Sequence, residues 1–424
     1  MTKWLSVITL LALAAGVALG AGVAASGDAG LEYLAIQFGH VGDLWLNLLR
    51  MTVIPLVFSL LVTGVASVAT AASTGRLAAH SIFVFGTLLA SATLFACVVF
   101  PLILMIWPVD PAAVSGMIAD AASKKVDAVA PPTLGEWAAA LAPSNVIAAA
   151  SRGEVLPLVV FAMLFGFAAT RLSTDQRVPM VNFFRAVADT MIVIVRWVLV
   201  AAPIGVFALA LGVGLTAGVG IVGLIAHYII LVSGVTALIV PLAFLFVWIW
   251  GGVSPPRFLA AAGPVLAVAM SSRSSLASLP LMVERSRDVL GVPERVAGIV
   301  LPLAVAIFRM TSPVANLGVV FFCAAVFGVE LGVTELIVGG FVAMAISIGS
   351  VGLPGEISFI ASVAPISMAM GVPIELLGLL VAVEAVPDIF RTVGNVSGDM
   401  AAAVIAGRNQ PASSQEEIAA GPPG

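Results

Sequence analysis

The sequence predicts an all-α membrane protein with eight transmembrane helices and two re-entrant helical hairpins. Of its 424 residues, 61% are hydrophobic and 9% are charged, whereas a soluble domain carries about a quarter charged residues. Apolar runs long enough for a helix to cross a bilayer, about 18 residues or more, recur along the chain. These runs are too long and too continuous for the strands of a membrane barrel.

Charge and reactive residues exclude several function classes. The net charge of -4 argues against a nucleic-acid partner. Cys97 and Cys323 lie in apolar runs and are expected to be small core residues, without a disulfide or a metal cluster. His40, His80 and His227 are scattered, so no metal site is predicted. The Gly-x-Ser-x-Gly pattern of a nucleophile elbow is absent, which argues against an enzyme.

The first 250 residues contain a series of apolar segments separated by charged connections. They fall near 4–26, 40–70, 78–107, 146–170, 186–214 and 219–250. Residues 1–26 resemble a secretory signal in carrying Lys3 before an apolar stretch, but that stretch is longer than a signal core and favours a first membrane helix.

Positive charge predicts the orientation in the membrane. One alternate set of connections carries the arginines, namely Arg76, Arg171, Arg177 and Arg185. Basic connections face the cytoplasm, so the N-terminus is expected inside. The polar tail 408–424 is expected to be disordered and cytoplasmic.

After residue 254 the apolar runs become shorter and are interrupted. Residues 258–285 hold two apolar halves around a polar tip, and residues 334–369 repeat this arrangement. Each half is too short to span about 30 Å, which is typical of a re-entrant hairpin. A longer helix follows each hairpin, over 296–328 and over 374–407. Interrupted segments at matching places in two halves predict a transporter built from inverted repeats.

A polar stripe runs along the last predicted helix. Its members fall within about 100° of arc at 100° per residue: Glu384, Asp388, Arg391, Thr392, Asn395 and Asp399. A charge at mid-bilayer costs roughly 2.5–3.5 kcal/mol, so such groups normally face a cavity or one another. The stripe suits a zwitterionic or anionic small solute; the alternative is a polar seam between helices. Pro387 predicts a kink beside Asp388.

The hairpin tips are candidate ligand sites. The first, 271–275, has four serines and Arg273, and hydroxyls and free N–H groups at half-helix ends can bind a carboxylate. The second, 352–356, has glycines that let the backbone approach a ligand and move as a gate. The alternatives are a cytoplasmic turn for the first tip and an extracellular loop with a solvated Glu356 for the second.

Arg309 lies between apolar residues and cannot shed its charge. We therefore expect an anionic partner, first Asp399, then Glu356 or Asp388. Pro313 is expected to release the Arg309 carbonyl and to break the helix, exposing polar backbone to a cavity. The alternative is a structural ion pair that only locks the helices.

The order of hairpin, broken helix, hairpin and polar helix resembles the dicarboxylate/amino acid:cation symporters, which include glutamate and aspartate transporters. The resemblance covers nearly the whole chain. Its segments are 43–59, 153–161, 202–207, the tips 273–275 and 352–355, and the last-helix signature Asp388, Arg391, Thr392, Asn395 and Asp399. Leu276 departs from the pattern, because a third serine is usual there.

The resemblance implies a homotrimer in which a transport domain moves like an elevator against a fixed scaffold. The scaffold would comprise helices 1–2 in 1–75 and helices 4–5 in 146–214. The transport domain would comprise helix 3 with an extracellular loop in 76–145, helix 6 in 215–254, and the core of hairpins and helices 7–8 in 255–407.

The resemblance also implies roles for site residues. Asp388 would bind a substrate ammonium with help from Thr392, and Arg391 would bind the side-chain carboxylate through its planar fork. Asn395 and the Ser275 backbone would hold the α-carboxylate. Further substrate contacts are implied for Arg273, Ser274, Ser312, Leu353 and Gly355. An acid at 388 favours an acidic amino acid.

One departure concerns sodium. Sodium-dependent members carry Asn-Met-Asp-Gly-Thr where this chain has Phe308-Arg309-Met310-Thr311-Ser312. A nearby guanidinium opposes sodium binding. Our hypothesis is that Arg309, paired with Asp399, replaces the ion, so that no metal or cofactor is needed. A proton is then the candidate coupling ion, with Glu356 or Glu384 as its carrier.

The sequence thus predicts a multi-pass carrier of the inner membrane, in contact with lipid, that takes up aspartate or glutamate without sodium. A carrier of C4-dicarboxylates is the first alternative, and a neutral amino acid carrier is disfavoured by Arg391. An anion channel between the two domains is a hypothesis from another class.

Overall fold

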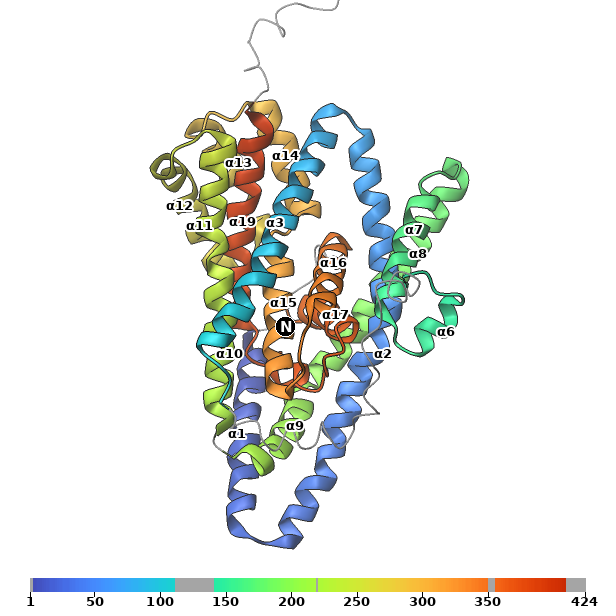
Figure 1. Cartoon of the computed structure of the whole chain (residues 1–424), viewed down its shortest axis with the longest axis vertical. Coiled ribbons are helices and arrows are strands. Elements are labelled where there is room, and N and C mark those ends of the chain that lie inside the picture. Colours follow the sequence, from blue (N-terminus) through green and yellow to red (C-terminus); the bar gives the residue numbers. More distant parts are fainter. Residues whose placement is uncertain (1–2, 111–140, 219, 350–354, 409–424) are drawn as a thin grey trace, which may run out of the picture.

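A computed structural model gives the fold, and it describes residues 3–110, 141–218, 220–349 and 355–408. The regular structure of these residues is helical (Figure 1). The first half contains α1 (Lys3–Ser26), α2 (Ala29–Ser73), α3 (Arg76–Ile106), α6 (Val146–Ser151), α7 (Val155–Ala169), α8 (Thr174–Val200) and α9 (Ala202–Ala217). The second half contains α10 (Gly220–Ala237), α11 (Ile239–Phe246), η1 (Val247–Gly251), α12 (Pro255–Ser272), α13 (Ser275–Asp288), α14 (Glu294–Ile307), α15 (Thr311–Phe327), α16 (Val333–Gly349), α17 (Gly355–Ala369), α18 (Leu377–Leu380) and α19 (Ala385–Gly407).

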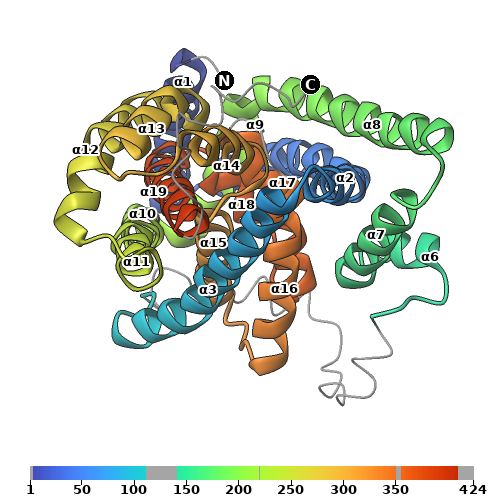
Figure 2. The ribbon, with the colours of Figure 1, turned by 90° about the horizontal axis from the view of Figure 1, so that it is seen from above.

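The helices pack in two groups. In the first, α2 lies along α7, α8 and α9, and α1 packs on α9. In the second, α19 is surrounded by α3 and by α10 to α15, as Figure 2 shows from above. The pair α16 and α17 contacts both α2 and α15 and so lies between the groups. The predicted scaffold and transport domains stay a prediction.

Five helical stretches of the described residues are long and apolar enough to cross a membrane. They are Val7–Ser26, Ala29–Ser73, Arg76–Ile106, Gly220–Gly251 and Glu294–Phe327. The pair α8 and α9 adds a sixth if it forms one span, although the two helices are bent by 62° at Ala201. The eight predicted spans are therefore matched only in part by length and composition.

Two apolar segments predicted as single helices are divided. Segment 146–170 breaks between α6 and α7, where Gly153 takes a φ of +70° that favours glycine. Segment 186–214 bends at Ala201, and Pro203 stands in the first turn of α9, where its missing N–H removes no helical bond. Helix α8 also begins earlier than predicted, at Thr174.

The two interrupted regions have short helical halves. In the first, α12 and α13 pack on each other and have 18 and 14 residues. In the second, α16 and α17 pack on each other and have 17 and 15 residues. The tip between α16 and α17, including Leu353, lies outside the described residues.

The last predicted helix, 374–407, is wrong as a single element. It is divided into α18 and α19 by a turn over residues 381–384, and Glu384 is the residue directly before α19. Pro387 does not kink a continuous helix, because it lies in the first turn of α19; the interruption lies just before it, at 381–384. Five stripe members thus lie on α19, and Glu384 precedes it.

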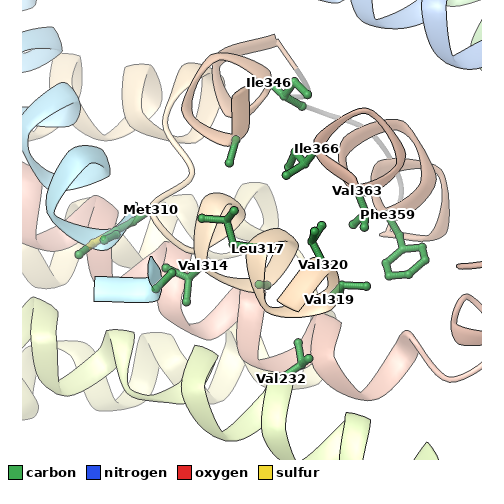
Figure 3. Close-up of a cluster of buried hydrophobic side chains, with 14 of the residues drawn as sticks. Val232, Met310, Val314, Leu317, Val319, Val320, Ile346, Phe359, Val363 and Ile366 are labelled. Carbon is green, nitrogen blue, oxygen red and sulfur yellow. The ribbon is translucent and has the colours of Figure 1, made fainter. Parts of the chain in front are cut away.

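Helix α15 is the buried centre of the second group. Figure 3 shows its apolar side chains gathered with those of α10, α16 and α17, including Leu317, Val320, Val232, Ile346 and Phe359. Fully burying one such side chain stabilises the fold by about 1.5–3 kcal/mol. Within Glu294–Phe327, which spans α14 and α15, 94% of the most apolar 18-residue stretch is buried inside the protein. This broken span therefore faces protein rather than lipid.

Candidate functional site

A cavity of about 520 Å³ lies where the first hairpin tip, the break between α14 and α15, the start of α17 and the start of α19 meet. This volume falls in the usual range for small-molecule sites, about 300–1,000 Å³. The lining residues predicted from the sequence are Arg273, Ser274, Ser275, Arg309, Ser312, Gly355, Asp388, Arg391, Thr392 and Asn395. The cavity therefore brings together ten residues that are dispersed over some 120 positions.

The first hairpin contributes a strained turn and a capped helix. Arg273 adopts the left-handed conformation, with φ of 51°, which is uncommon for a residue other than glycine. Ser274 then caps α13, because its Oγ accepts a hydrogen bond from the Ala277 N–H at 3.2 Å. Ser275 is the first residue of α13, so its own N–H has no partner within the helix.

Arg273 also ties this tip to the start of α19. Its Nη1 lies 3.7 Å from Asp388 Oδ2 and donates to the Ala385 carbonyl at 3.5 Å. The Asp388 carboxylate lies against Gly355, where an added Cβ would be 2.9 Å from Oδ2. Thr392 donates its hydroxyl to the Asp388 carbonyl at 3.0 Å. Asp388 is thus held by one hairpin and packed against the other.

The break between α14 and α15 covers Phe308 to Met310, as predicted, but not through Pro313. The Arg309 carbonyl is not released, because it accepts a hydrogen bond from the Ser312 N–H at 3.1 Å. Phe308 ends α14 with extended backbone, φ -122° and ψ 129°. Pro313 stands in the first turn of α15, where a proline removes no helical hydrogen bond.

Thr311 links this break to α19. Its N–H donates to Asn395 Oδ1 at 3.0 Å, and its hydroxyl lies 2.7 Å from the same oxygen and 2.9 Å from the Arg391 carbonyl. Gly394 permits this approach, since a Cβ there would overlap the Thr311 methyl group. With its oxygen occupied, Asn395 keeps its amide Nδ2 as a donor for a ligand.

Arg391 is held on two sides by buried groups. Its Nη1 donates to Asn316 Oδ1 at 2.6 Å, and Asn316 donates in turn to Ser312 Oγ at 3.2 Å. Its Nε lies 3.0 Å from Glu384 Oε1, an ion pair whose angle is too poor for a hydrogen bond. Glu384 Oε2 accepts the Tyr228 hydroxyl at 3.0 Å. Arg391 Nη2 has no hydrogen-bond partner among the described residues.

Asp399 lies outside the cavity and is not paired with Arg309, contrary to expectation. The Asp399 carboxylate is 1% exposed, and neither of its oxygens has a hydrogen-bond partner in the described chain. Arg309 makes no ion pair within 4.0 Å there either, and lines the cavity instead. The two charges interact only through space.

The two proton-carrier candidates occupy different places. Glu384 is buried between Tyr228 and Arg391, next to the cavity but not lining it. Glu356, in the first turn of α17, lies at a small separate pocket with Thr9 of α1 and Leu199 of α8. Glu356 therefore lies where α17 meets the first group of helices.

Three residues that hold the site were missed by sequence reasoning: Tyr228, Thr311 and Asn316. Each is a polar side chain in an apolar helix, and each is buried. Tyr228 is one of only two tyrosines in the chain, which is the one signal that was available. The described residues contain no group of three or more histidine, cysteine or acidic side chains suited to a metal ion.

Comparison with known proteins places the chain in one family. Residues 5–409 match the model of the Sodium:dicarboxylate symporter family. The Proton/glutamate-aspartate symporter of Escherichia coli K12 is 27% identical over 407 residues, covering 93% of this chain and 90% of the relative. The Proton/sodium-glutamate symport protein of Bacillus subtilis is 28% identical over 382 residues, covering 86% and 84%.

A human relative matches over a similar length. The Neutral amino acid transporter B(0) of Homo sapiens is 30% identical over 440 residues, covering 93% of this chain and 78% of the relative. Relatives named for different substrates and coupling ions thus have nearly the same sequence identity to this chain. The chain belongs to the Sodium:dicarboxylate symporter family, and it is a multi-pass membrane transporter of dicarboxylates or amino acids, coupled to a cation, and not an enzyme.

Proposed function

We propose that this protein takes up acidic amino acids, aspartate or glutamate, and that it does so without sodium. The observation that carries the proposal is the charge of the cavity wall. Among the described residues that line it, three are arginines and one is an acid, namely Arg273, Arg309, Arg391 and Asp388. Such a wall favours an anion, and the acid adds a place for an ammonium group.

The free donors of the site match the groups of an acidic amino acid. Arg391 Nη2 would bind the side-chain carboxylate, as a charge-assisted hydrogen bond. Asn395 Nδ2 and the Ser275 N–H would hold the α-carboxylate. Asp388 and Thr392 would take the ammonium, with further contacts from Arg273, Ser274, Ser312 and Gly355, which line the cavity.

Arg309 supports independence from sodium. It places a permanent positive charge in the cavity wall at the break of α14 and α15. Sodium would need several oxygen ligands, and a cation about 4 Å away would oppose it by about 4 kcal/mol at an effective dielectric of 20. Arg309 would act on Asp399 through space, rather than by the direct ion pair expected from the sequence.

A proton is the proposed coupling ion. Glu384 would carry it, because this buried carboxylate contacts Arg391 directly and its protonation would change the charge around the substrate-binding guanidinium. Glu356 is the second candidate, since it lies on α17 beside the first group of helices.

The proposed motion is that of an elevator with eight spans and two re-entrant hairpins in inverted repeats. The scaffold would be 1–75 and 146–214, and the transport domain 76–145, 215–254 and 255–407. The packing of α1, α2 and α7 to α9 in one group, and of α19 with α3 and α10 to α15 in the other, supports this division. We further propose a homotrimer in the inner membrane with both termini in the cytoplasm.

The test is uptake of radiolabelled aspartate into proteoliposomes of purified protein. Sodium and proton gradients are imposed separately, with choline replacing sodium. We expect equal uptake in both salts and faster uptake with an inward proton gradient. Glu384→Gln should weaken the proton response without creating a sodium requirement. Strong sodium dependence in the wild type would defeat the proposed mechanism.

A carrier of C4-dicarboxylates is a second candidate, and the pairing of Arg273 with Asp388 favours it. This pairing neutralises the acid that would otherwise repel a dianion. Competition of aspartate uptake by succinate and malate separates the candidates: strong competition by both indicates that the ammonium group is dispensable.

A further inference from the structure

Arg309 differs from the other arginines of the cavity in having no partner. Arg273 pairs with Asp388, and Arg391 pairs with Glu384 and Asn316. For Arg309 no hydrogen bond or ion pair is formed with any residue in the part of the chain that the structure describes, although the side chain is half-buried and lines the cavity.

Asp399, the acid expected from the sequence to pair with Arg309, makes no ion pair with its guanidinium. Asp399 is enclosed and away from the cavity, so the two interact only through space. No Arg309 nitrogen is among the enclosed, unpartnered polar atoms of the described residues, so its N–H donors are open to the cavity. The cavity is where a ligand for these donors would lie.

The geometry points to Arg309 as a second carboxylate-binding residue for the substrate. Arg391 lines the cavity, but its one nitrogen without any partner, Nη2, is enclosed, whereas the unpaired fork of Arg309 is open to the cavity and suits a carboxylate. This inference rests on the proposed transport of small anions and names their class: dicarboxylates, with or without an α-ammonium group. Asp388 does not make the ammonium obligatory, because Arg273 already neutralises it.

Arg309 would then have two roles. Its charge would replace a bound cation in attracting an anionic substrate, and its N–H groups would contact that substrate. A residue that acted only through its charge would favour substrates by their net charge, and a lysine could replace it. Direct binding by the planar fork predicts instead that a lysine at this position restores little of the affinity for substrates with two carboxylates.

The experiment measures this selectivity with purified full-length protein in sodium-free buffer. Binding of aspartate, succinate and asparagine is followed by competition in proteoliposomes and by ligand-induced shifts in thermal melting. Asparagine matches aspartate in shape but has one carboxylate, and succinate lacks the ammonium. The variants are Arg309→Met and Arg309→Lys. Arg295→Met is the control, because Arg295 is exposed in the first turn of α14.

We expect Arg309→Met to weaken aspartate and succinate at least tenfold and asparagine less than threefold. Arg309→Lys should show a smaller loss of affinity than Arg309→Met, because lysine keeps the positive charge but lacks the planar fork. The control should match the wild type. Loss of aspartate affinity below threefold in Arg309→Met, or an equal loss for all three ligands, would overturn the inference.

The wild type separates this inference from the proposed function. Sodium dependence in the wild type would contradict the sodium-free mechanism, while a selective loss in Arg309→Met, measured in saturating sodium, would still support direct binding. Preference of the wild type for asparagine over aspartate would overturn both. If Arg309→Met fails to fold, Arg309→Lys decides the question. A wild-type affinity for aspartate in Arg309→Lys would contradict recognition by the guanidinium fork. A loss confined to aspartate and succinate would support it.

Discussion

The guanidinium on α19 and the guanidinium in the break between α14 and α15 line the same cavity but are held in opposite ways. Arg391 has a buried carboxylate on one side and a buried amide on the other, with a tyrosine behind the carboxylate. Arg309 has no direct partner in the described residues and feels Asp388 and Asp399 only through space.

The difference shows that a charged side chain in this cavity can be held in place by other protein groups or can keep its donors unpaired for a ligand. The Arg391 side chain is 11% exposed and is positioned by contacts with residues of α10 and α15 and with Glu384 before α19. Its position is therefore determined before substrate arrives, which lowers the entropy lost on binding. Arg309 would become ordered by the substrate itself.

The largest effect is expected from Arg391→Met, which should reduce aspartate uptake by two orders of magnitude or more. It should also destabilise the protein by about 3–5 kcal/mol, because Glu384 would stay buried without its cation. Thermal melting of the purified protein measures the second effect. Adding Glu384→Gln should restore melting but not uptake. Equal destabilisation by Arg309→Met would contradict the difference between the two arginines, because Arg309 has no hydrogen-bond or ion-pair partner among the described residues to lose.

Gly394→Ala tests how closely α19 must approach the break. The new methyl would overlap the Thr311 methyl, and such overpacking typically costs about 1–3 kcal/mol. We expect uptake to fall about tenfold or more through displacement of Arg391 and Asn395. Thr311→Ser removes the clashing methyl but keeps the hydroxyl, so the double variant should recover. Gly234→Ala is the control, because nothing lies within 4 Å of its added Cβ; a similar loss there would point to helix effects alone.

Asn316→Ala sharpens the comparison by removing one anchor of Arg391. A hydrogen bond to a charged group contributes about 1.5–3 kcal/mol to stability, and we expect the less firmly held guanidinium to raise the KM for aspartate by up to about tenfold. Arg391 would then resemble Arg309 in part. Uptake kinetics give KM and kcat separately. An unchanged KM would mean that Glu384 alone positions the guanidinium.

The smallest effect is expected from Tyr228→Phe, which acts on Arg391 only through Glu384. Loss of this hydrogen bond should lower stability by about 1 kcal/mol and uptake by about twofold to fivefold. The informative readout is the pH profile of uptake, which should shift if Glu384 carries the proton. A profile identical to that of the wild type would argue against proton transfer at Glu384.

The sequence predicted the local parts of this site and missed the contacts between helices. The first hairpin and four cavity residues of the stripe follow from apolar length and 100° periodicity, which are local properties. The break at 308–310 was expected from Pro313, which stands in the first turn of α15 and does not cause it. The turn at 381–384 was missed because three of its four residues are apolar and none is glycine or proline. Asn316 and Tyr228 were missed because their roles depend on a partner 75 and 156 positions away.

The expected pairing of Arg309 with Asp399 shows a further limit. Opposite charges in apolar surroundings suggested a contact, yet side-chain direction decides it, and direction depends on how the break turns the chain. Asp399 also lies beside Gly398, against which Met310 packs closely. The methionine that follows Arg309 thus packs against α19 one residue before Asp399.

The contact of Arg391 with Glu384 also determines how the membrane potential acts on this carrier. A potential does work of about 2.3 kcal/mol per elementary charge and 100 mV, but only on net charge that crosses the field. When both side chains are charged, they form a dipole without net charge, and any displacement moves both together. The voltage dependence of transport would therefore report the charges of the cargo and of groups outside this pair, such as Arg309 and Asp399, while the Arg391–Glu384 pair would contribute nothing.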